Sequence, residues 1–137
     1  MKSHKDLDVW NKGIDLVTMI YNITKEFPKD ELYSLTNQIR RAAVSIPSNI
    51  AEGAARNSTK EFIHFLFISL GSVAELETQI YLSVKLNYIE SSASSTIQDE
   101  LIKLKQMILG LNLSPGLICS HLLCQHSRLC VSEKSYL

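Results

Sequence analysis

The sequence contains few residues that interrupt helices, with five glycines and three prolines among its 137 residues. It also lacks any sustained alternation of apolar and polar residues, which would indicate a half-buried β-strand. Four segments instead carry apolar residues at three- and four-residue spacing, the pattern of amphipathic helices. We therefore predict an all-α protein, and a hydrophobic content of 45% is sufficient for a single domain with its own core.

An excess of charge of one sign is also missing, since 14 basic residues balance 14 acidic ones. Bulk charge therefore cannot draw this protein to nucleic acid or to an anionic membrane, and such binding needs a local patch. No apolar run approaches the ~20 residues that cross a bilayer, and the N-terminal stretch MKSHKDLDVW has no apolar signal core. We expect a cytoplasmic protein that has no membrane partner.

Cysteine is absent from the first 118 residues, and the three cysteines of the chain stand close together near its end. An odd, clustered set argues against a disulfide framework. With two histidines they make five potential zinc ligands: Cys119, His121, Cys124, His126 and Cys130. Their spacing matches no standard zinc finger or ribbon, so we favour a weakly helical or disordered extension, with adventitious metal binding, over a structural zinc site. We predict no metal and no cofactor.

Four helices are predicted, over residues 6 or 8 to 24, 29–56, 59–86 and 96–111. Ser58 with Glu61, and Ser95 with Gln98, have the spacing of capping boxes, so they mark the starts of the third and fourth helices. The short links between the segments favour an antiparallel up-down-up-down four-helix bundle over residues 1–111. Residues 112–137 then form an atypical tail.

The second helix contains a proline in its middle, within the stretch QIRRAAVSIPSNIAEG. Its apolar stripe stays in phase on both sides of Pro47, at Leu32, Leu35, Ile39, Ala43, Ile46, Ile50 and Ala54. A break would usually reset the phase, so we predict a continuous helix that is kinked at Pro47. Ser45 and Ser48 flank the proline, and their hydroxyls can donate to carbonyls that it leaves without a partner.

The third helix carries apolar residues around nearly its whole circumference between residues 62 and 70. One small bundle cannot cover so much apolar surface, so we predict a second face that is buried between subunits. The alternative is an aromatic cluster that closes one end of a monomer's core.

Polar residues form a stripe on the second helix and another on the third. We predict that the two stripes face each other as a structural network with these members: Gln38, Ser45, Asn49, Glu52 and Glu75. A solvated face, with Glu52 and Arg56 as an ordinary four-apart ion pair, is one alternative. Contact with a ligand or a nucleic acid is the other.

Basic residues are slightly concentrated in the first half of the chain, with nine lysines and arginines against seven acids in residues 1–60. The candidates for phosphate contact are Arg40, Arg41, Arg56 and Lys60, because guanidinium and ammonium groups bind phosphates. The sequence shows no base-reading motif and no aromatic platform. It therefore supports only backbone or shape recognition.

Catalytic constellations are not apparent in the sequence. His64 stands in an aromatic run and is best explained as a packed or rim histidine. Glu75 and Glu77 lie two residues apart on one helix, so they point to different sides and cannot act as paired carboxylates. We predict that the protein is not an enzyme and has no catalytic residues.

Three stretches of the chain carry a resemblance to a known family: DLDVWNKGIDLV, KEFPKDELYSLTNQIRRAAVSIPSNIAEG and STKEFIHFLFISLGSVAELETQIYLSVKLNYI. Together they closely resemble the proteins encoded within intervening sequences of bacterial 23S ribosomal RNA genes. The resemblance implies a four-helix bundle that assembles as a ring, commonly a pentamer, and that has no known catalytic activity.

The same resemblance implies kinship with the accessory protein of diversity-generating retroelements, which binds nucleic acid and a reverse transcriptase. Our leading hypothesis is therefore a homo-oligomeric accessory protein that binds RNA or DNA. The alternative is a structural oligomer or a protein-interaction adaptor that does not bind nucleic acid.

Overall fold

The computed structural model describes residues 3–113, which contain four α-helices and no strand. The helices are α1 (Asp8–Ile23), α2 (Leu35–Ala55), α3 (Thr59–Lys85) and α4 (Ser91–Leu113), with short 3₁₀ turns at His4–Asp6, Thr24–Glu26 and Lys29–Glu31. The prediction of an all-α, four-helix protein is confirmed. The cysteines and histidines considered as zinc ligands lie outside the described residues.

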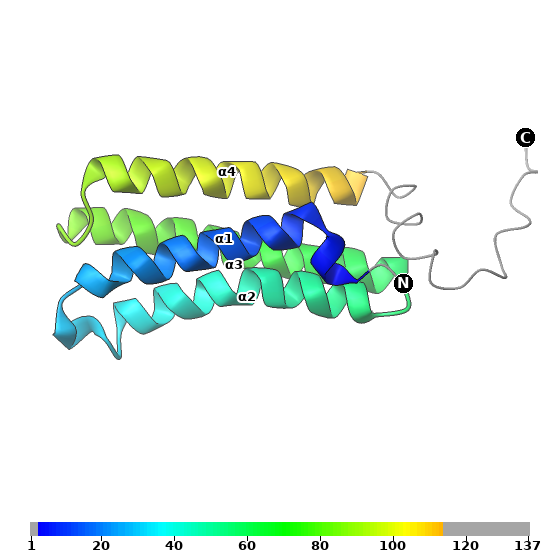
Figure 1. The fold of residues 1–137 in the computed structure, drawn as a ribbon, viewed down its shortest axis with the longest axis horizontal. Coiled ribbons are helices and arrows are strands. Elements are labelled where there is room, and N and C mark those ends of the chain that lie inside the picture. Colours follow the sequence, from blue (N-terminus) through cyan, green and yellow to red (C-terminus); the bar gives the residue numbers. More distant parts are fainter. Residues whose placement is uncertain (1–2, 114–137) are drawn as a thin grey trace, which may run out of the picture.

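The four helices lie side by side, as Figure 1 shows, and they enclose one apolar core. The links from α1 to α2 and from α3 to α4 lie at one end of the bundle, and the link from α2 to α3 lies at the other. The largest fully buried side chains come from all four helices: Phe62, Ile20, Ile39, Ile46, Ile50, Leu66, Leu76, Ile80, Ile97, Leu101, Leu104 and Ile108. At the surface, Glu100 of α4 forms salt bridges with Lys12 of α1 and with Lys103.

The α2–α3 hairpin is tightly packed at its turn. A Cβ atom added to Gly53 would lie 2.6 Å from the Cβ of Phe65 and 3.0 Å from a ring carbon of Phe62, so only glycine fits there. The Ser58 hydroxyl accepts the N–H of Glu61 at 3.4 Å, which confirms Ser58 as the N-cap of α3. Glycine and cap together allow α3 to start four residues after α2 ends.

The predicted start of α2 is wrong by six residues, because a 3₁₀ turn at Lys29–Glu31 and a further turn over residues 32–34 precede the helix. The Glu31 carboxylate accepts the backbone N–H of Leu35 at 3.2 Å and the hydroxyl of Ser34, so it satisfies donors at the start of α2 from outside the helix. The Tyr88 hydroxyl donates to the same carboxylate at 3.0 Å. Leu32, predicted in the core stripe, is 45% exposed as a result.

The predicted start of α4 is also wrong, since the helix begins at Ser91 and not at Thr96. Asn87 takes the left-handed conformation (φ 59°) directly after α3, and the Tyr88 N–H donates to the Ser83 carbonyl at 2.9 Å. This helix-ending motif reverses the chain within a few residues. The serine-rich segment that follows is therefore not a loop but the first turn of α4, and Ser94 is buried there.

Pro47 lies inside α2, which continues through it as one helix. The predicted continuity is therefore confirmed, whereas the bend at Pro47 stays a prediction. The Ser45 hydroxyl donates to the Ala42 carbonyl and the Ser48 hydroxyl to the Val44 carbonyl, both at 2.8 Å. Both hydroxyls therefore donate to carbonyls in the turn before Pro47, on either side of Ala43, the residue four before the proline.

Within the part of the chain that the structure describes, none of the helices combines the length and the hydropathy that a bilayer span requires.

Candidate functional site

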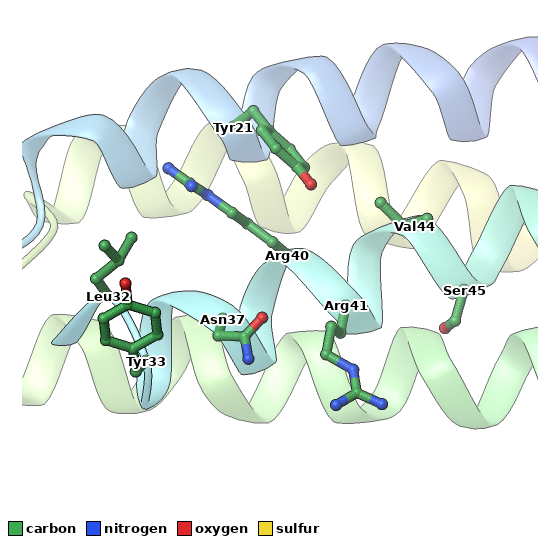
Figure 2. Close-up of a pocket in the computed structure, with 8 residues that line it drawn as sticks. All are labelled: Tyr21, Leu32, Tyr33, Asn37, Arg40, Arg41, Val44 and Ser45. Atoms are coloured by element: carbon green, nitrogen blue, oxygen red, sulfur yellow. The ribbon is translucent and has the colours of Figure 1, made fainter.

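An open hollow of about 670 Å³ lies on the surface where α1 meets the first half of α2. Figure 2 shows the side chains that line it, namely Tyr21, Leu32, Tyr33, Asn37, Arg40, Arg41, Val44 and Ser45. Its volume is within the range of small-molecule sites, but it is wide open to solvent. A hollow of this kind suits an extended ligand that lies along the surface better than a small, enclosed one.

Arg40 is held against α1 and forms one wall of this hollow. Its Nε donates to the Thr24 hydroxyl oxygen at 2.9 Å, and its guanidinium carbon lies 4.8 Å from the centre of the Tyr21 ring. Figure 2 shows the two side chains extending toward each other from their helices. The Thr24 hydroxyl in turn donates to the Ile20 carbonyl at 2.8 Å, so the position of Arg40 is fixed by a buried partner.

Arg41 is exposed and extends the other way, toward α3, as seen in Figure 2. It also lines a second hollow of about 440 Å³ between α2 and α3, together with Asn37, Gln38, Ala42, Ser45, Ser72 and Glu75. No salt bridge of Arg41 is present within residues 3–113. Its guanidinium group can therefore reach an anion in either hollow.

Three members of the predicted polar network line the second hollow, Gln38 and Ser45 from α2 and Glu75 from α3. Asn49 and Glu52 do not line it. The hydrogen bonds found for the network side chains in the described residues stay within single helices. The Asn49 amide donates to the Ser45 carbonyl at 2.7 Å, and the Gln79 amide donates to Glu75 Oε1 at 3.1 Å.

Arg56 is the C-cap residue of α2 and Lys60 lies in the first turn of α3, on the two sides of the link between these helices. Arg56 forms a salt bridge with Glu52 at 3.0 Å and approaches Glu61 at 4.0 Å. Its guanidinium carbon also lies 5.3 Å from the Phe65 ring centre. About 15 residues of helix, or ~22 Å, separate it from Arg41, so the four predicted cations do not form one patch.

A separate apolar surface follows the outer sides of α3 and α4. Phe67 and Tyr81 are 56% and 59% exposed, and Leu82, Leu86, Ile102 and Leu109 are also exposed. Tyr81 and Ile102 line a shallow hollow of about 400 Å³, together with Glu77, Thr78 and Gln98. Of these residues, Phe67 lies in the stretch of α3, residues 62–70, that the sequence marked as having more apolar residues than one bundle can cover.

The residues considered for catalysis lie apart from one another. His64 is exposed, with its ring centre 5.9 Å from that of Phe65. Glu75 and Glu77 line different hollows, as the helical spacing predicted. Within residues 3–113, no three His, Cys, Asp or Glu side chains gather in a group that could hold a metal ion.

The side chains whose pKa values are shifted take part in structural contacts. The hydroxyl of Ser34, the N–H of Leu35 and the hydroxyl of Tyr88 lower the pKa of Glu31, and the Glu31 carboxylate raises the pKa of Tyr88. Hydrogen bonds from Lys103 and Lys12 lower the pKa of Glu100, and this carboxylate raises the pKa of Lys103. The hydrogen bonds and ion pairs that cause these pKa shifts stabilise helix ends and helix contacts. The shifts therefore do not mark a proton-transfer site.

The two tyrosines of the first hollow were missed from the sequence. Tyr33, Asn37 and Arg41 follow each other at four-residue intervals outside the apolar stripe, and this spacing was the available signal. Tyr21 comes from α1, so its place beside Arg40 depends on how the two helices pack. The structure thus provides an aromatic surface beside the arginines, where the sequence showed none.

Fold and site together define an all-α protein with four bundled helices and an open hollow that combines arginine with tyrosine. The chain belongs to the family described as 23S rRNA-intervening sequence protein, whose model matches residues 5–110.

A similar fold occurs in a crystal structure at 1.70 Å resolution from Bacteroides thetaiotaomicron, of a protein of unknown function from the S23 ribosomal protein family. The TM-score is 0.71 at 24% sequence identity, over 76% of this chain and 97% of the other. This likeness shows the fold. No curated protein matches the chain.

Proposed function

We propose that the protein is a non-enzymatic, ring-forming accessory protein that binds the backbone of RNA or DNA. The observation that carries this proposal is Arg41, an exposed arginine that lines two adjoining hollows and forms no salt bridge within the described residues. The description of the family, which refers to 23S rRNA, supports a nucleic acid as the partner.

Assembly into a homo-oligomer, with a pentamer as the proposed state, is supported by the apolar surface of α3 and α4. Exposed side chains such as Phe67 and Tyr81 are typical of surfaces that are covered in an assembly. A ring repeats the Arg41 site in each copy, so several weak contacts act together on one nucleic-acid chain.

We propose that each subunit of the ring is an up-down-up-down bundle in which α2 is bent at Pro47. The positions of the helix links at the bundle ends support that order (Figure 1).

We propose that the protein acts in the cytoplasm. Its partner is either an RNA that carries a 23S intervening sequence, or a retroelement nucleic acid together with its reverse transcriptase. The family match supports the first of these. The absence of a catalytic role is supported by the separation of His64, Glu75 and Glu77. Gene neighbourhood distinguishes the two settings, since it would show an rRNA operon, a reverse transcriptase, or neither.

An electrophoretic shift assay tests the binding with two matched variants. Arg41→Gln and Arg56→Gln remove the same charge from the same helix, but Arg56 is already paired with Glu52. We expect Arg41→Gln to weaken RNA binding across all sequences and to reduce the slope of log K against log salt by about one for each phosphate that is no longer bound. Arg56→Gln should change the affinity much less.

Equal loss of affinity in both variants would show that only net charge matters, and it would remove Arg41 as the phosphate-binding residue. Negligible binding by the unmodified protein at moderate salt would remove nucleic-acid binding altogether.

The second candidate is a structural oligomer or a protein-interaction adaptor that does not bind nucleic acid. The exposed apolar side chains of α3 and α4 favour it. Co-purification of a protein partner without RNA or DNA would support this function. Sedimentation velocity that shows a compact single chain at micromolar concentration would contradict the ring.

A further inference from the structure

We infer that the hollow between α1 and α2 binds a single-stranded nucleic acid, with a base stacked on Tyr33 and a phosphate held by Arg41. The inference rests on the proposed nucleic-acid binding and adds the strandedness of the ligand and the residues that select it. Three features of the hollow support it: a solvent-exposed ring, a fixed backbone beneath that ring, and a cation on the same side of α2.

Tyr33 is the first of these features. Its side chain is 89% exposed, so it has almost no packing role in the monomer and both ring faces are accessible. Stacking on an exposed aromatic ring is how proteins that bind single strands hold successive bases. Ordering an aromatic side chain on binding costs little conformational entropy, because it has only two side-chain torsions.

The backbone around Tyr33 is held in place. The Glu31 carboxylate accepts the Leu35 N–H at 3.2 Å, and the Ser34 N–H donates to the Glu31 carbonyl at 3.0 Å. The Tyr88 hydroxyl ties the same carboxylate to the link between α3 and α4. The exposed ring therefore extends from a turn that is anchored on both sides, so little backbone ordering has to accompany binding.

The cationic part of the hollow lies one to two helical turns along α2. Asn37 and Arg41 continue the four-residue spacing from Tyr33, so the ring, an amide and a guanidinium group line one side of the hollow in sequence (Figure 2). Arg40 adds a second positive charge, fixed between Thr24 and the Tyr21 ring. A single strand presents flat bases and anionic phosphates in alternation along its length, so one strand can meet both the ring and the guanidinium group.

A duplex fits this arrangement less well, because its base faces are stacked inside the helix and only phosphates and groove edges remain accessible. The nearby carboxylates keep their negative charge, but other partners hold them. Glu31 accepts from its three donors, and Glu75 faces the second hollow with one oxygen bonded to Gln79. The exposed ring therefore favours a strand with unpaired bases.

Fluorescence anisotropy with three labelled ligands of equal length tests the inference. The ligands are an oligouridine of about 12 nucleotides, within the range of known single-strand sites, an abasic strand with the same backbone, and an RNA duplex. The variants are Tyr33→Ala and Tyr33→Phe. The control is Gln106→Ala, which removes an exposed, uncharged side chain from α4, outside both hollows and outside the apolar surface.

We expect the unmodified protein to prefer oligouridine to the duplex, and Tyr33→Ala to weaken oligouridine binding about 5- to 100-fold. Tyr33→Phe keeps the stacking face and should retain the affinity, as should Gln106→Ala. The abasic strand has nothing to stack, so Tyr33→Ala should leave its binding unchanged.

A preference for the duplex, or a Tyr33→Ala variant that binds oligouridine as well as the unmodified protein does, would overturn the inference. In those cases the proposed function would stand, because nucleic acid still binds. Loss of abasic-strand binding in Tyr33→Ala would equally overturn it, since that loss indicates a structural effect. Binding to none of the three ligands would overturn both proposals.

Discussion

The two ends of α2 carry similar charged residues in opposite structural situations. At the C-terminal end, Arg56 is paired with Glu52 and lies over Phe65, close to the point where α2 and α3 approach through Gly53. At the other end, the helix starts late, the hollow is open, and Arg41 has no salt bridge in the described residues. Residue type alone therefore does not identify a binding cation. The packing around each end determines which arginine is available.

The largest expected effect concerns the tightly packed end. Gly53→Ala places a Cβ atom 2.6 Å from the Phe65 Cβ, which cannot move without its backbone. We expect the free energy of unfolding to fall by about 1–3 kcal/mol, the usual cost of overpacking. Urea denaturation measures this change.

Gly71→Ala is the control for this substitution, because a Cβ atom at Gly71 meets nothing within 4 Å. Alanine has the higher helix propensity, so this variant should gain about 0.5–1 kcal/mol. If both variants changed stability in the same direction, the contrast between the packed and the open parts of the hairpin would fail.

The second effect concerns the open end and depends on pH. Hydrogen bonds from Ser34, Leu35 and Tyr88 lower the pKa of Glu31 in the folded state. The carboxylate therefore stabilises the fold above its unfolded pKa, and this contribution is lost as the pH falls through the folded pKa. Glu31→Gln should lower the melting temperature at pH 7.

The deficit should shrink as the pH falls from 7 and should vanish below the folded pKa of Glu31, where the group is protonated in both states. Thermal melts followed by circular dichroism over a series of decreasing pH values provide the measurement. A deficit of constant size across the series would mean that the charge of Glu31 does not stabilise the start of α2.

The smallest effect concerns binding at the second hollow. Glu75 faces Arg41 across it, so its negative charge should oppose a phosphate that approaches Arg41. Glu75→Gln should strengthen oligouridine binding about twofold at low salt, and less at physiological salt because of screening.

Glu77→Gln makes the same charge change on the side of α3 that faces α4, and its affinity should not change. Equal strengthening in both variants would indicate an effect of net charge and not of position.

The sequence was sufficient for the parts of the fold that local signals determine. The end of α1 and both ends of α3 were predicted to within one residue, since the cap at Ser58 lies in the adjacent sequence. The late start of α2 depends on Tyr88, 57 residues away from Glu31, and no local pattern reveals such a contact. This contact explains the error at the start of α2, whereas the early start of α4 follows a local helix-ending motif at Asn87 that the prediction overlooked.

The candidate site was predictable to a similar degree. Arg41 was identified from its place on the polar side of α2, but its difference from Arg40 depends on Thr24 and Tyr21 in another part of the chain. The exposure of Tyr33 follows from the turn that precedes α2. Both features arise from packing between segments, which spacing within one helix does not encode.

The contact between α1 and α2 at Gly13 and Pro47 has a consequence for sequence divergence. A Cβ atom at residue 13 would lie 3.3 Å from the Cβ of Pro47, so the glycine and the proline share one small space. A bulkier residue at either position fits only if the other position changes or the helices move apart. In related chains, substitutions at these two positions should therefore occur together. The pair provides a coevolutionary marker of how closely the first two helices approach each other.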